Sequence, residues 1–258
     1  MNEIEKFEIE VQNNIDSLMN DKDIQALSRI WIREIIPHKW VYNFSWLGRP
    51  AIQVPNDAWA LQELVWKIKP DLIIETGIAH GGSLMISASL LALLDYTDAV
   101  ESGKVLDPKS SNRKVIGIDI DIRQHNRLAI EQHPLSHKIQ MFEGSSIDPS
   151  VVNAVKEAAK GYQRILVCLD SNHTHDHVLA ELEAYAPLVT SGSYCIVYDT
   201  IVEDMPESMF RDRPWKPGNS PKSAVSAYLN KCDDFVVDEQ MDAKLLISVA
   251  TGGFLKRL

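Results

Sequence analysis

The sequence predicts an α/β fold: a seven-stranded, mostly parallel sheet with an antiparallel last strand and helices on both faces. Short, continuously apolar runs alternate with segments of helical periodicity, as in a parallel sheet that is covered on both faces. The last two apolar runs are close together, so these two strands are expected to pair antiparallel. A chain of 258 residues with 45% apolar and 24% charged residues can bury the core that this fold needs.

The N-terminal segment, residues 1–55, is expected to consist of helices and an ordered loop that pack on the core. Residues 3–36 mix apolar and polar positions at helical spacing, which predicts one or two helices. The remainder of the segment holds Gly48, Pro50 and Pro55, which indicates an ordered loop. The main domain then comprises residues 56–258.

From residue 56 onward, helices and strands are expected to alternate. Asn56 or Asp57 can cap a helix that ends before Pro70. The expected strands are residues 71–75, 115–120, 139–142, 165–170, 194–199, 235–238 and 245–249. The expected helices between them are residues 82–96, 123–132, 151–160, 177–185 and 224–231, and residues 203–221 form a polar, Pro-rich loop.

The net charge of −10 argues against a nucleic-acid partner, because nucleic-acid binders concentrate Lys and Arg. We predict neither a membrane-spanning helix nor a signal peptide, because no apolar run is expected to be long enough and the N-terminus is acidic, which argues against a membrane partner. Of the widely spaced Cys168, Cys195 and Cys232, two lie in apolar runs, where a buried, reduced thiol is the ordinary state. We therefore expect a cytoplasmic enzyme, a homo-oligomer, with a small-molecule substrate.

A glycine-rich turn, from Glu75 to Ser83, follows the first strand of the main domain and leads directly into a helix. Glycines let the backbone approach a ligand closely, and ligands of such sheets lie at the carboxyl ends of the strands. The next strand ends in Asp119-Ile-Asp121, where a carboxylate commonly binds ribose hydroxyls. The third ends in Glu143-Gly-Ser-Ser146, whose small polar residues could contact an adenine edge. Together these features predict a nucleoside cofactor.

Charge decides between the possible cofactors. A dinucleotide-binding turn has the pattern G-x-G-x-x-G, but this chain has Ala79 at the second glycine position. In addition, the carboxylate of Glu75 would repel a pyrophosphate. S-adenosylmethionine has a sulfonium, an ammonium and no phosphate, so it is favoured over NAD. The expected cofactor-binding residues are Glu75, Thr76, Gly77, Ala79, Gly81, Gly82, Ser83, Asp119, Asp121, Gly144, Ser145, Ser146 and Asp170.

Two later strands end in carboxylates, Asp170 and Asp199. Carboxylates on neighbouring strand ends can converge on one hard cation and leave positions open for substrate oxygens. The alternative is that both residues only cap the segments that follow. His173 lies closest to Asp170 and is a plausible general base, so His173 and Asp170 are the candidate catalytic residues. His175 and His177 are expected to be solvated residues at a helix start, because no acidic or Cys group at zinc-ligand spacing accompanies them.

From about Trp46 to Leu258 the chain resembles the cephalosporin hydroxylase/rhamnosyl O-methyltransferase family, a branch of the class I methyltransferases. The shared motifs are Trp46-Leu-Gly, Gln53-x-Pro55, Pro70-Asp-Leu-Ile-Ile-Glu-Thr-Gly, His80-Gly-Gly-Ser, Gly117-Ile-Asp-Ile, Leu169-Asp-Ser-x-His173, Pro214-Trp-x-Pro-Gly-Asn and Gly252-Gly-Phe-Leu-Lys-Arg. The resemblance implies a seven-stranded Rossmann-like methyltransferase sheet, S-adenosylmethionine and a Mg²⁺ ion near the transferred methyl group. Related sequences often have Glu before the second metal-binding Asp, where this chain has Tyr198, so Thr200 or Glu203 could supply the missing ligand.

These features together predict a Mg²⁺-dependent O-methyltransferase that acts on a hydroxyl of a sugar or polyol-like small molecule. Residues 203–221 carry aromatic and Arg side chains, including Arg213 and Trp215, that could close over a polar ring or merely pack on the surface. A metal-dependent hydroxylase, an NAD-dependent oxidoreductase and a non-catalytic protein of the same fold remain as alternatives.

Overall fold

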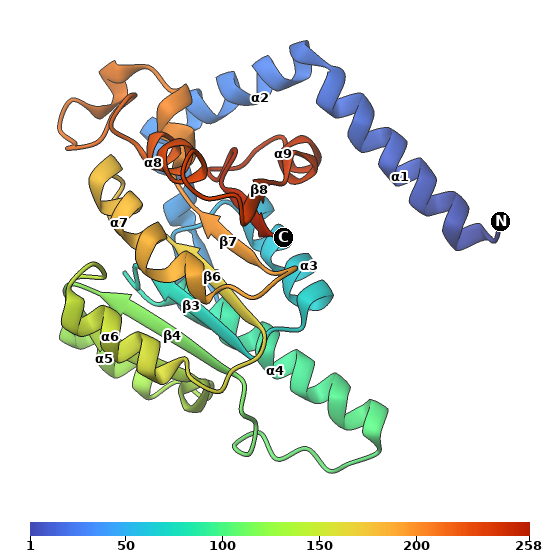
Figure 1. Cartoon of the computed structure of the whole chain (residues 1–258), viewed down its shortest axis with the longest axis vertical. Helices are drawn as coiled ribbons and strands as arrows, with labels where there is room; N and C mark the ends of the chain where they lie inside the picture. The colour runs from blue at the N-terminus through green and yellow to red at the C-terminus, as the bar shows by residue number, and fades with distance from the viewer.

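One central sheet organises the computed structural model, which describes residues 1–258 (Figure 1). Its strand order is β5-β4-β3-β6-β7-β9-β8. The strands are β3 (Leu72–Thr76), β4 (Lys114–Asp119), β5 (Ile139–Glu143), β6 (Ile165–Leu169), β7 (Tyr194–Val197), β8 (Phe235–Val237) and β9 (Phe254–Arg257). Strands β3 to β7 pair parallel, and β9 pairs antiparallel with both β7 and β8. The predicted seven-stranded sheet with an antiparallel last strand is therefore confirmed.

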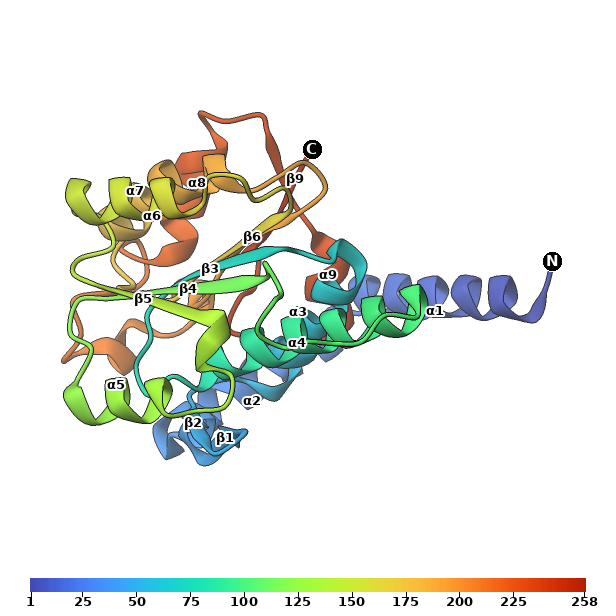
Figure 2. The ribbon, with the colours of Figure 1, turned by 90° about the horizontal axis from the view of Figure 1, so that it is seen from below.

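The sheet separates two layers of helices, which Figure 2 shows above and below it. The helices of one layer are α3 (Pro55–Ile68), α4 (Gly82–Ser102), α5 (Gln124–Glu131) and α9 (Glu239–Leu245). Those of the other are α6 (Pro149–Ala158), α7 (His175–Tyr185) and α8 (Pro221–Leu229). Every residue of β3 and β6 is buried, because both faces of the central strands are covered.

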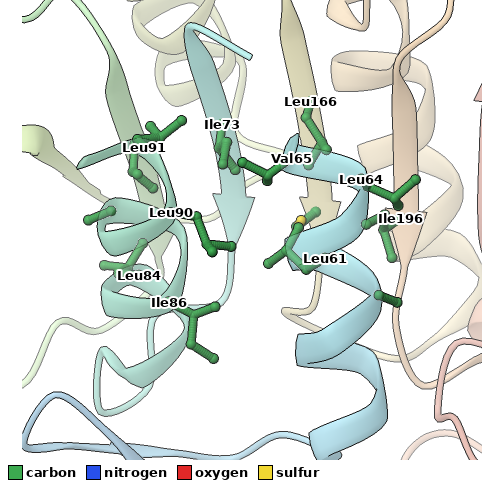
Figure 3. Packing of buried hydrophobic residues seen from close by; sticks show 14 of the residues in the cluster. Leu61, Leu64, Val65, Ile73, Leu84, Ile86, Leu90, Leu91, Leu166 and Ile196 are labelled. Atoms are coloured by element: carbon green, nitrogen blue, oxygen red, sulfur yellow. The ribbon is translucent and has the colours of Figure 1, made fainter. Parts of the chain in front are cut away.

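Side chains of successive strand residues point to opposite layers, as the strand period requires. Ile73 and Leu166 belong to the cluster beneath α3 and α4, whereas Leu72 and Val167 belong to the cluster on the opposite face. Figure 3 shows how Val65 of α3 lies against the first pair. The continuous apolar runs of the sequence thus serve two hydrophobic cores, one on each side of the sheet.

Helix α4 extends to Ser102, beyond the predicted end at residue 96. By length and composition it is the one helix that could cross a membrane, contrary to the expectation that no apolar stretch is long enough. Half of this apolar stretch is buried, and the helix packs against α3 and β4. Its hydrophobicity is therefore that of a core helix.

The N-terminal segment contains more regular structure than the sequence predicts. Two helices, α1 (Glu3–Asn20) and α2 (Lys22–Ile35), are followed by the 3₁₀ turns η1 (Ile36–His38) and η2 (Trp40–Asn43). The hairpin β1 (Phe44–Trp46) and β2 (Arg49–Ala51) comes next, in place of the expected loop. Asp21 caps α2 by accepting hydrogen bonds from the backbone N–H groups of the helix's first turn.

The predicted strand at residues 245–249 is wrong. The chain forms α9 up to Leu245, and the last strand is β9. Ile247 and Val249 instead line a cleft, and the Val249 backbone N–H donates to the Asp57 carboxylate at 3.0 Å. Apolar residues that wall a cleft and apolar residues of a strand give the same short run in a sequence, so periodicity does not separate them.

Candidate active site

A cleft of about 570 Å³ lies at the carboxyl ends of β3, β6 and β7. The strand order reverses between β3 and β6, which is where ligands of such sheets bind. The glycine-rich turn from Gly77 to Ser83 forms part of its wall. The rest comes from three other regions: residues 32–54, the segment after β6, and residues 199–215 with Ile247 and Val249.

Asp170, His173 and Asp199 converge in this cleft. Their potential ligand atoms all lie within 4.8 Å of one another. His173 Nε2 is 3.0 Å from Asp199 Oδ2. The structure therefore brings together the catalytic and acidic metal candidates, although they come from the ends of two different strands.

The electrostatics of the cluster favour a bound cation. Burial, and next the negative charge of Asp199, raise the pKa of Asp170 well above its ordinary value. Glu75 and Glu181 add to the same negative field. A divalent cation would relieve this repulsion, and the carboxylate oxygens are the hard donors that Mg²⁺ prefers over imidazole nitrogen. The donor set thus fits Mg²⁺, which Asp170 and Asp199 would hold.

The backbone at Asp199 is in the left-handed region, with φ of +54°. Such backbone is uncommon outside glycine, and it is tolerated where the surrounding structure holds it. Two contacts do so: the Tyr198 N–H donates to Leu169 O at 2.9 Å, and the Val202 N–H donates to Asp199 O at 3.1 Å. In this conformation the carboxylate of Asp199 lies beside His173, which follows β6 in the chain.

The glycine-rich turn approaches the β6 end directly. A Cβ at Gly77, where φ is +88°, would lie 2.0 Å from the backbone oxygen of Asp170. Ala79 has a left-handed φ of +45°. Asn126 Nδ2 donates to Ala79 O, and the Arg49 guanidinium donates to His80 O, so two residues that the sequence analysis missed clamp the turn. Nothing in the local sequence indicates these long-range contacts.

Asp119 holds the same turn from the β4 end. Its Oδ2 accepts hydrogen bonds from the backbone N–H groups of Ile78 at 2.8 Å and Ala79 at 3.0 Å. Its Oδ1 accepts from the Asp121 N–H at 3.2 Å. The hydrogen-bond partners of Asp119 in the structure are therefore backbone N–H groups, whereas the sequence predicts ribose hydroxyls. The Asp121 side chain is 70% exposed.

Glu75 is buried behind the turn. Burial raises its pKa to about 7, which the neighbouring hydroxyls of Ser83 and Ser87 only partly offset. Ser87 donates to Oε2, while Oε1 has no hydrogen-bond partner. A small void of about 10 Å³ adjoins this carboxyl, and Ser83 and Asp170 line both the void and the main cleft. A buried carboxyl that has one oxygen without a hydrogen-bond partner and lies next to a ligand cleft fits a cationic ligand group.

Gly144, Ser145 and Ser146, from the β5 end, do not line the cleft. The Ser146 hydroxyl points inward and donates to Glu181 Oε1 at 2.5 Å. His177 Nε2 lies 3.0 Å from the same hydroxyl. Among the other expected cofactor residues, Gly77, Ala79, Gly82, Ser83 and Asp170 line the cleft, whereas Thr76 and Gly81 do not.

The expectation that His175 and His177 are solvated is wrong. His175 Nδ1 lies 2.8 Å from the Ser223 hydroxyl of α8, and the His177 side chain is only 17% exposed. Both rings fix α7 to neighbouring segments, and neither belongs to the Asp170 cluster. One ring nitrogen of each histidine has a partner inside the protein, which supports a structural role for both.

Glu203 lies outside the cluster of acidic and histidine side chains, whereas the role of Thr200 as a metal ligand stays a prediction. The Thr200 hydroxyl donates to Val249 O at 3.2 Å. Glu203 accepts hydrogen bonds from the Gly218 N–H and the Ser220 hydroxyl. Both side chains thus brace loops around the site, and the cluster consists of Asp170, Asp199 and His173.

Trp215 contacts the histidine of the cluster. Its ring meets the His173 ring edge-to-face, with centroids 4.7 Å apart. The Arg213 guanidinium lies over the Trp215 ring at 5.2 Å. Asn219 anchors the loop of residues 203–221 to α7, because its Oδ1 accepts a hydrogen bond from the His175 N–H.

Ile32, Trp40 and Tyr42 also line the cleft, although no site residue was predicted in this part of the chain.

Comparisons with known proteins agree with this geometry. Residues 38–258 match the family described as Rhamnosyl O-methyltransferase/CmcI. The rhamnosyl O-methyltransferase of Mycobacterium tuberculosis (strain ATCC 25618 / H37Rv) is 27% identical over 234 residues, which cover 85% of this chain and 83% of that protein. The rhamnosyl O-methyltransferase of Mycobacterium leprae (strain TN) is 28% identical over 230 residues, covering 85% and 88%.

Among solved structures, CmcI with Mg and SAM superposes with a TM-score of 0.56 at 21% identity and covers 84% of this chain and 77% of that chain. This likeness supports the methyltransferase fold. Because the family match spans most of the sequence, the chain belongs to the rhamnosyl O-methyltransferase/CmcI family of S-adenosylmethionine-dependent methyltransferases.

Proposed function

We propose that this methyltransferase transfers the methyl group of S-adenosylmethionine to a hydroxyl of a sugar or polyol-like small molecule and requires Mg²⁺. The observation that carries the proposal is the convergence of Asp170, His173 and Asp199 beside the glycine-rich turn. Its family relatives are rhamnosyl O-methyltransferases, which supports a sugar-type acceptor.

The cofactor's charge suits its proposed site. The turn from Gly77 to Ser83 offers backbone at close range, and behind it Glu75 offers a carboxyl oxygen, Oε1, that has no hydrogen-bond partner. An ammonium group near Glu75 would keep this carboxylate ionised, whereas a pyrophosphate there would be repelled. This is the reason to prefer S-adenosylmethionine over NAD.

Asp170 and Asp199 would hold Mg²⁺. When bound, the ion would supply a positive charge that orients acceptor oxygens and makes a hydroxyl easier to deprotonate. The chain offers one imidazole with two carboxylates, not the two-His-one-carboxylate set of iron oxygenases, which disfavours the hydroxylase alternative.

His173 is placed to accept the acceptor's proton. With its Nε2–H donating to Asp199 at 3.0 Å, Nδ1 is left as the basic nitrogen. Trp215 packs against the ring edge-to-face and limits its rotation. The oriented oxygen would then attack the methyl carbon in line with the departing sulfur, and the enclosing residues 32–54 would limit access of water.

The metal requirement is testable by titration. We expect Mg²⁺ to raise the melting temperature of the wild-type protein, and Asp170→Asn or Asp199→Asn to abolish this rise. Methyl transfer from labelled S-adenosylmethionine to a panel of rhamnosides should be lost on chelation and return with Mg²⁺.

Asp176→Asn is the matched control, because Asp176 is exposed on α7 and outside the cluster. Full methyl transfer by chelator-treated enzyme would refute the metal assignment. Transfer to none of the sugars, with the cofactor bound, would refute the acceptor class.

A further inference from the structure

Two basic side chains, Lys39 and Arg213, line the same cleft as the proposed metal site. Both residues are exposed, and neither side chain forms an ion pair or a hydrogen bond within the chain. The carboxylates in the wall of the cleft are those of Asp170 and Asp199, which belong to the cluster with His173. The cleft therefore presents two positive charges that no ion pair of the chain balances.

The guanidinium of Arg213 is held close to the reacting groups. It lies 5.2 Å from the centroid of the Trp215 ring, and the Trp215 ring meets the His173 ring with centroids 4.7 Å apart. This contact holds the guanidinium in place and leaves its N–H donors without an acceptor. Such a fork of donors binds the paired oxygens of a carboxylate or a phosphate. An anion-binding group thus lies one aromatic ring away from the proposed base.

The acidic residues of the loop that carries Arg213 do not neutralise it. Glu207 pairs with Lys216 at 2.7 Å. Glu203 accepts hydrogen bonds from a backbone N–H group and a hydroxyl of the loop itself. Asp212 precedes Arg213 in the sequence, but it is exposed and forms no ion pair with it. The charge of Arg213 is therefore available to a ligand in the cleft.

Lys39 lies beside the same apolar cluster as Arg213. Ile36 and Phe210 both pack against this cluster, which is centred on Ile201. The Lys39 N–H donates to Ile36 O at 2.9 Å, and the Arg213 N–H donates to Phe210 O at 3.0 Å. Each base thus closes a tight turn whose first residue rests on the cluster. Apolar surroundings exclude water, which strengthens an ion pair formed next to them.

The charges in the cleft indicate what it accepts. With the proposed ligands bound, the two charges of Mg²⁺ match Asp170 and Asp199, and the net positive charge of S-adenosylmethionine matches Glu75. Lys39 and Arg213 are then left without counter-charges. An acceptor with a negative group would balance them, whereas a neutral sugar would not.

We propose that the acceptor is a sugar that carries an anionic group, a carboxylate or a phosphate, and that Arg213 and Lys39 bind this group. The inference rests on the proposed function and specifies its substrate class. Arg213 forms the bidentate contact, and Lys39 adds a point charge. Because Arg213 is fixed to His173 through Trp215, binding of the anion orients the sugar ring relative to the base.

Matched pairs of sugars test the proposal. Methyl α-D-galacturonoside is compared with methyl α-D-galactoside, and rhamnose 1-phosphate with methyl α-L-rhamnoside. Calorimetry with Mg²⁺ and S-adenosylhomocysteine present measures binding without turnover. The wild type should bind the anionic member of at least one pair at least about tenfold more tightly, and high salt should reduce this preference. The pair with the larger preference shows whether the anionic group is a carboxylate or a phosphate.

Variants of the two bases show whether they cause the preference. Arg213→Gln should reduce it to about twofold or less, and Arg213→Lys should retain more of it for phosphate than for carboxylate, since lysine acts as a point charge. Lys39→Gln should reduce it in part. Arg211→Gln is the matched control and should leave it unchanged, because Arg211 is exposed on the same loop and does not line the cleft.

Melting curves and S-adenosylhomocysteine binding would confirm that each variant is folded. If Arg213→Gln is unstable, the wild type decides the question, because a preference that does not change with salt would overturn the inference. A wild type that binds neutral and anionic sugars equally, or a preference that survives the loss of both bases, would overturn it and leave the proposed function intact. Binding of none of the four sugars would instead refute the sugar-type acceptor, and this inference with it.

Discussion

His173 has neighbours on two sides of its ring, which assign it a single orientation. Asp199 lies 3.0 Å from Nε2, and Trp215 packs edge-to-face at 4.7 Å. An exposed histidine at a helix start would rotate freely. The two contacts therefore orient the imidazole ring, which is consistent with the proposed proton transfer.

His173→Ala should lower turnover by roughly 10²- to 10⁴-fold, the usual contribution of a positioned base. Wild-type turnover should fall toward acidic pH, because the imidazole must be neutral to accept a proton, and the variant should lose this dependence. Binding of S-adenosylmethionine, measured by calorimetry, should hardly change.

His125→Ala is the control for this variant, because His125 is exposed on α5. His175→Ala is less suitable, since His175 contacts Ser223 and its loss would perturb α7 and α8. A His173→Ala enzyme with near wild-type turnover would remove the imidazole from the mechanism.

Glu75 should make cofactor binding depend on pH. Burial raises its pKa to about 7, so the free protein gains the carboxylate charge only as the pH approaches neutrality. Affinity for S-adenosylmethionine should therefore rise roughly tenfold between pH 5.5 and pH 7, below the range in which the ligand's amino group titrates. Calorimetry on Glu75→Gln should show weaker binding at pH 7 and a much flatter pH profile. Equal profiles for both proteins would contradict the proposed ammonium contact.

At the scale of the element, the turn after β3 and the end of β6 depend on each other. Gly77 lets the turn touch the Asp170 backbone, while Asp119 and Asn126 hold the turn from β4 and α5. These contacts join three strand ends and fix the distance between the proposed cofactor and metal sites. A change in the turn should therefore affect folding stability as well as ligand binding.

Gly77→Ala tests this coupling. We expect it to lower the free energy of unfolding by at least about 3 kcal/mol, because left-handed strain adds to a clash with backbone that cannot move aside. Gly218→Ala has a similar φ of +83° and nothing within 4 Å of the new Cβ, so it should cost only about 1–2 kcal/mol. Urea unfolding measures both. Equal losses of unfolding free energy in the two variants would show that the close approach of Gly77 to Asp170 does not contribute to the cost of the substitution.

At the scale of the whole molecule, helix α3 is tied to the chain's last loop, residues 246–253. Asp57 in α3 is fully buried and accepts a hydrogen bond from the Val249 N–H at 3.0 Å. Burial raises its pKa to about 7, the hydrogen bonds lower it in part, and the charges of Asp199 and Asp242 raise it further. The same loop continues to the wall of the active site.

This carboxyl makes folding sensitive to pH. Because the folded state binds its proton up to about pH 7 and the unfolded state releases it near pH 4, its contribution to stability is complete below pH 4 and is lost as the pH rises to 7. The free energy of unfolding of the wild type should fall by about 1–3 kcal/mol between pH 5 and pH 8 because of this carboxyl, and Asp57→Asn should not show this fall. Urea midpoints at the two pH values measure it, with the exposed Asp233→Asn as control. A loss as large in Asp57→Asn as in the wild type would contradict this account.

The sequence by itself determined the architecture and the heart of the candidate site. The central strands are recognisable because burial on both faces demands continuous apolar runs, as in β3 and β6. Parallel strands end at one edge, so Asp170 and Asp199 were expected to meet, and His173 follows Asp170 by only three residues. The free Cys168 and Cys195 were likewise expected, and both are buried.

Only the tertiary structure decided what each polar group faces. Asp119 binds the turn's backbone, Ser146 turns inward to Glu181, and Thr200 donates to Val249, three partners that lie 35 or more residues away in the sequence. Within the apolar run at residues 245–249, Ile247 and Val249 line the cleft, and the run contributes no strand to the sheet. Local sequence pattern reports that a residue is buried, whereas the partner against which it is buried depends on the path of the whole chain.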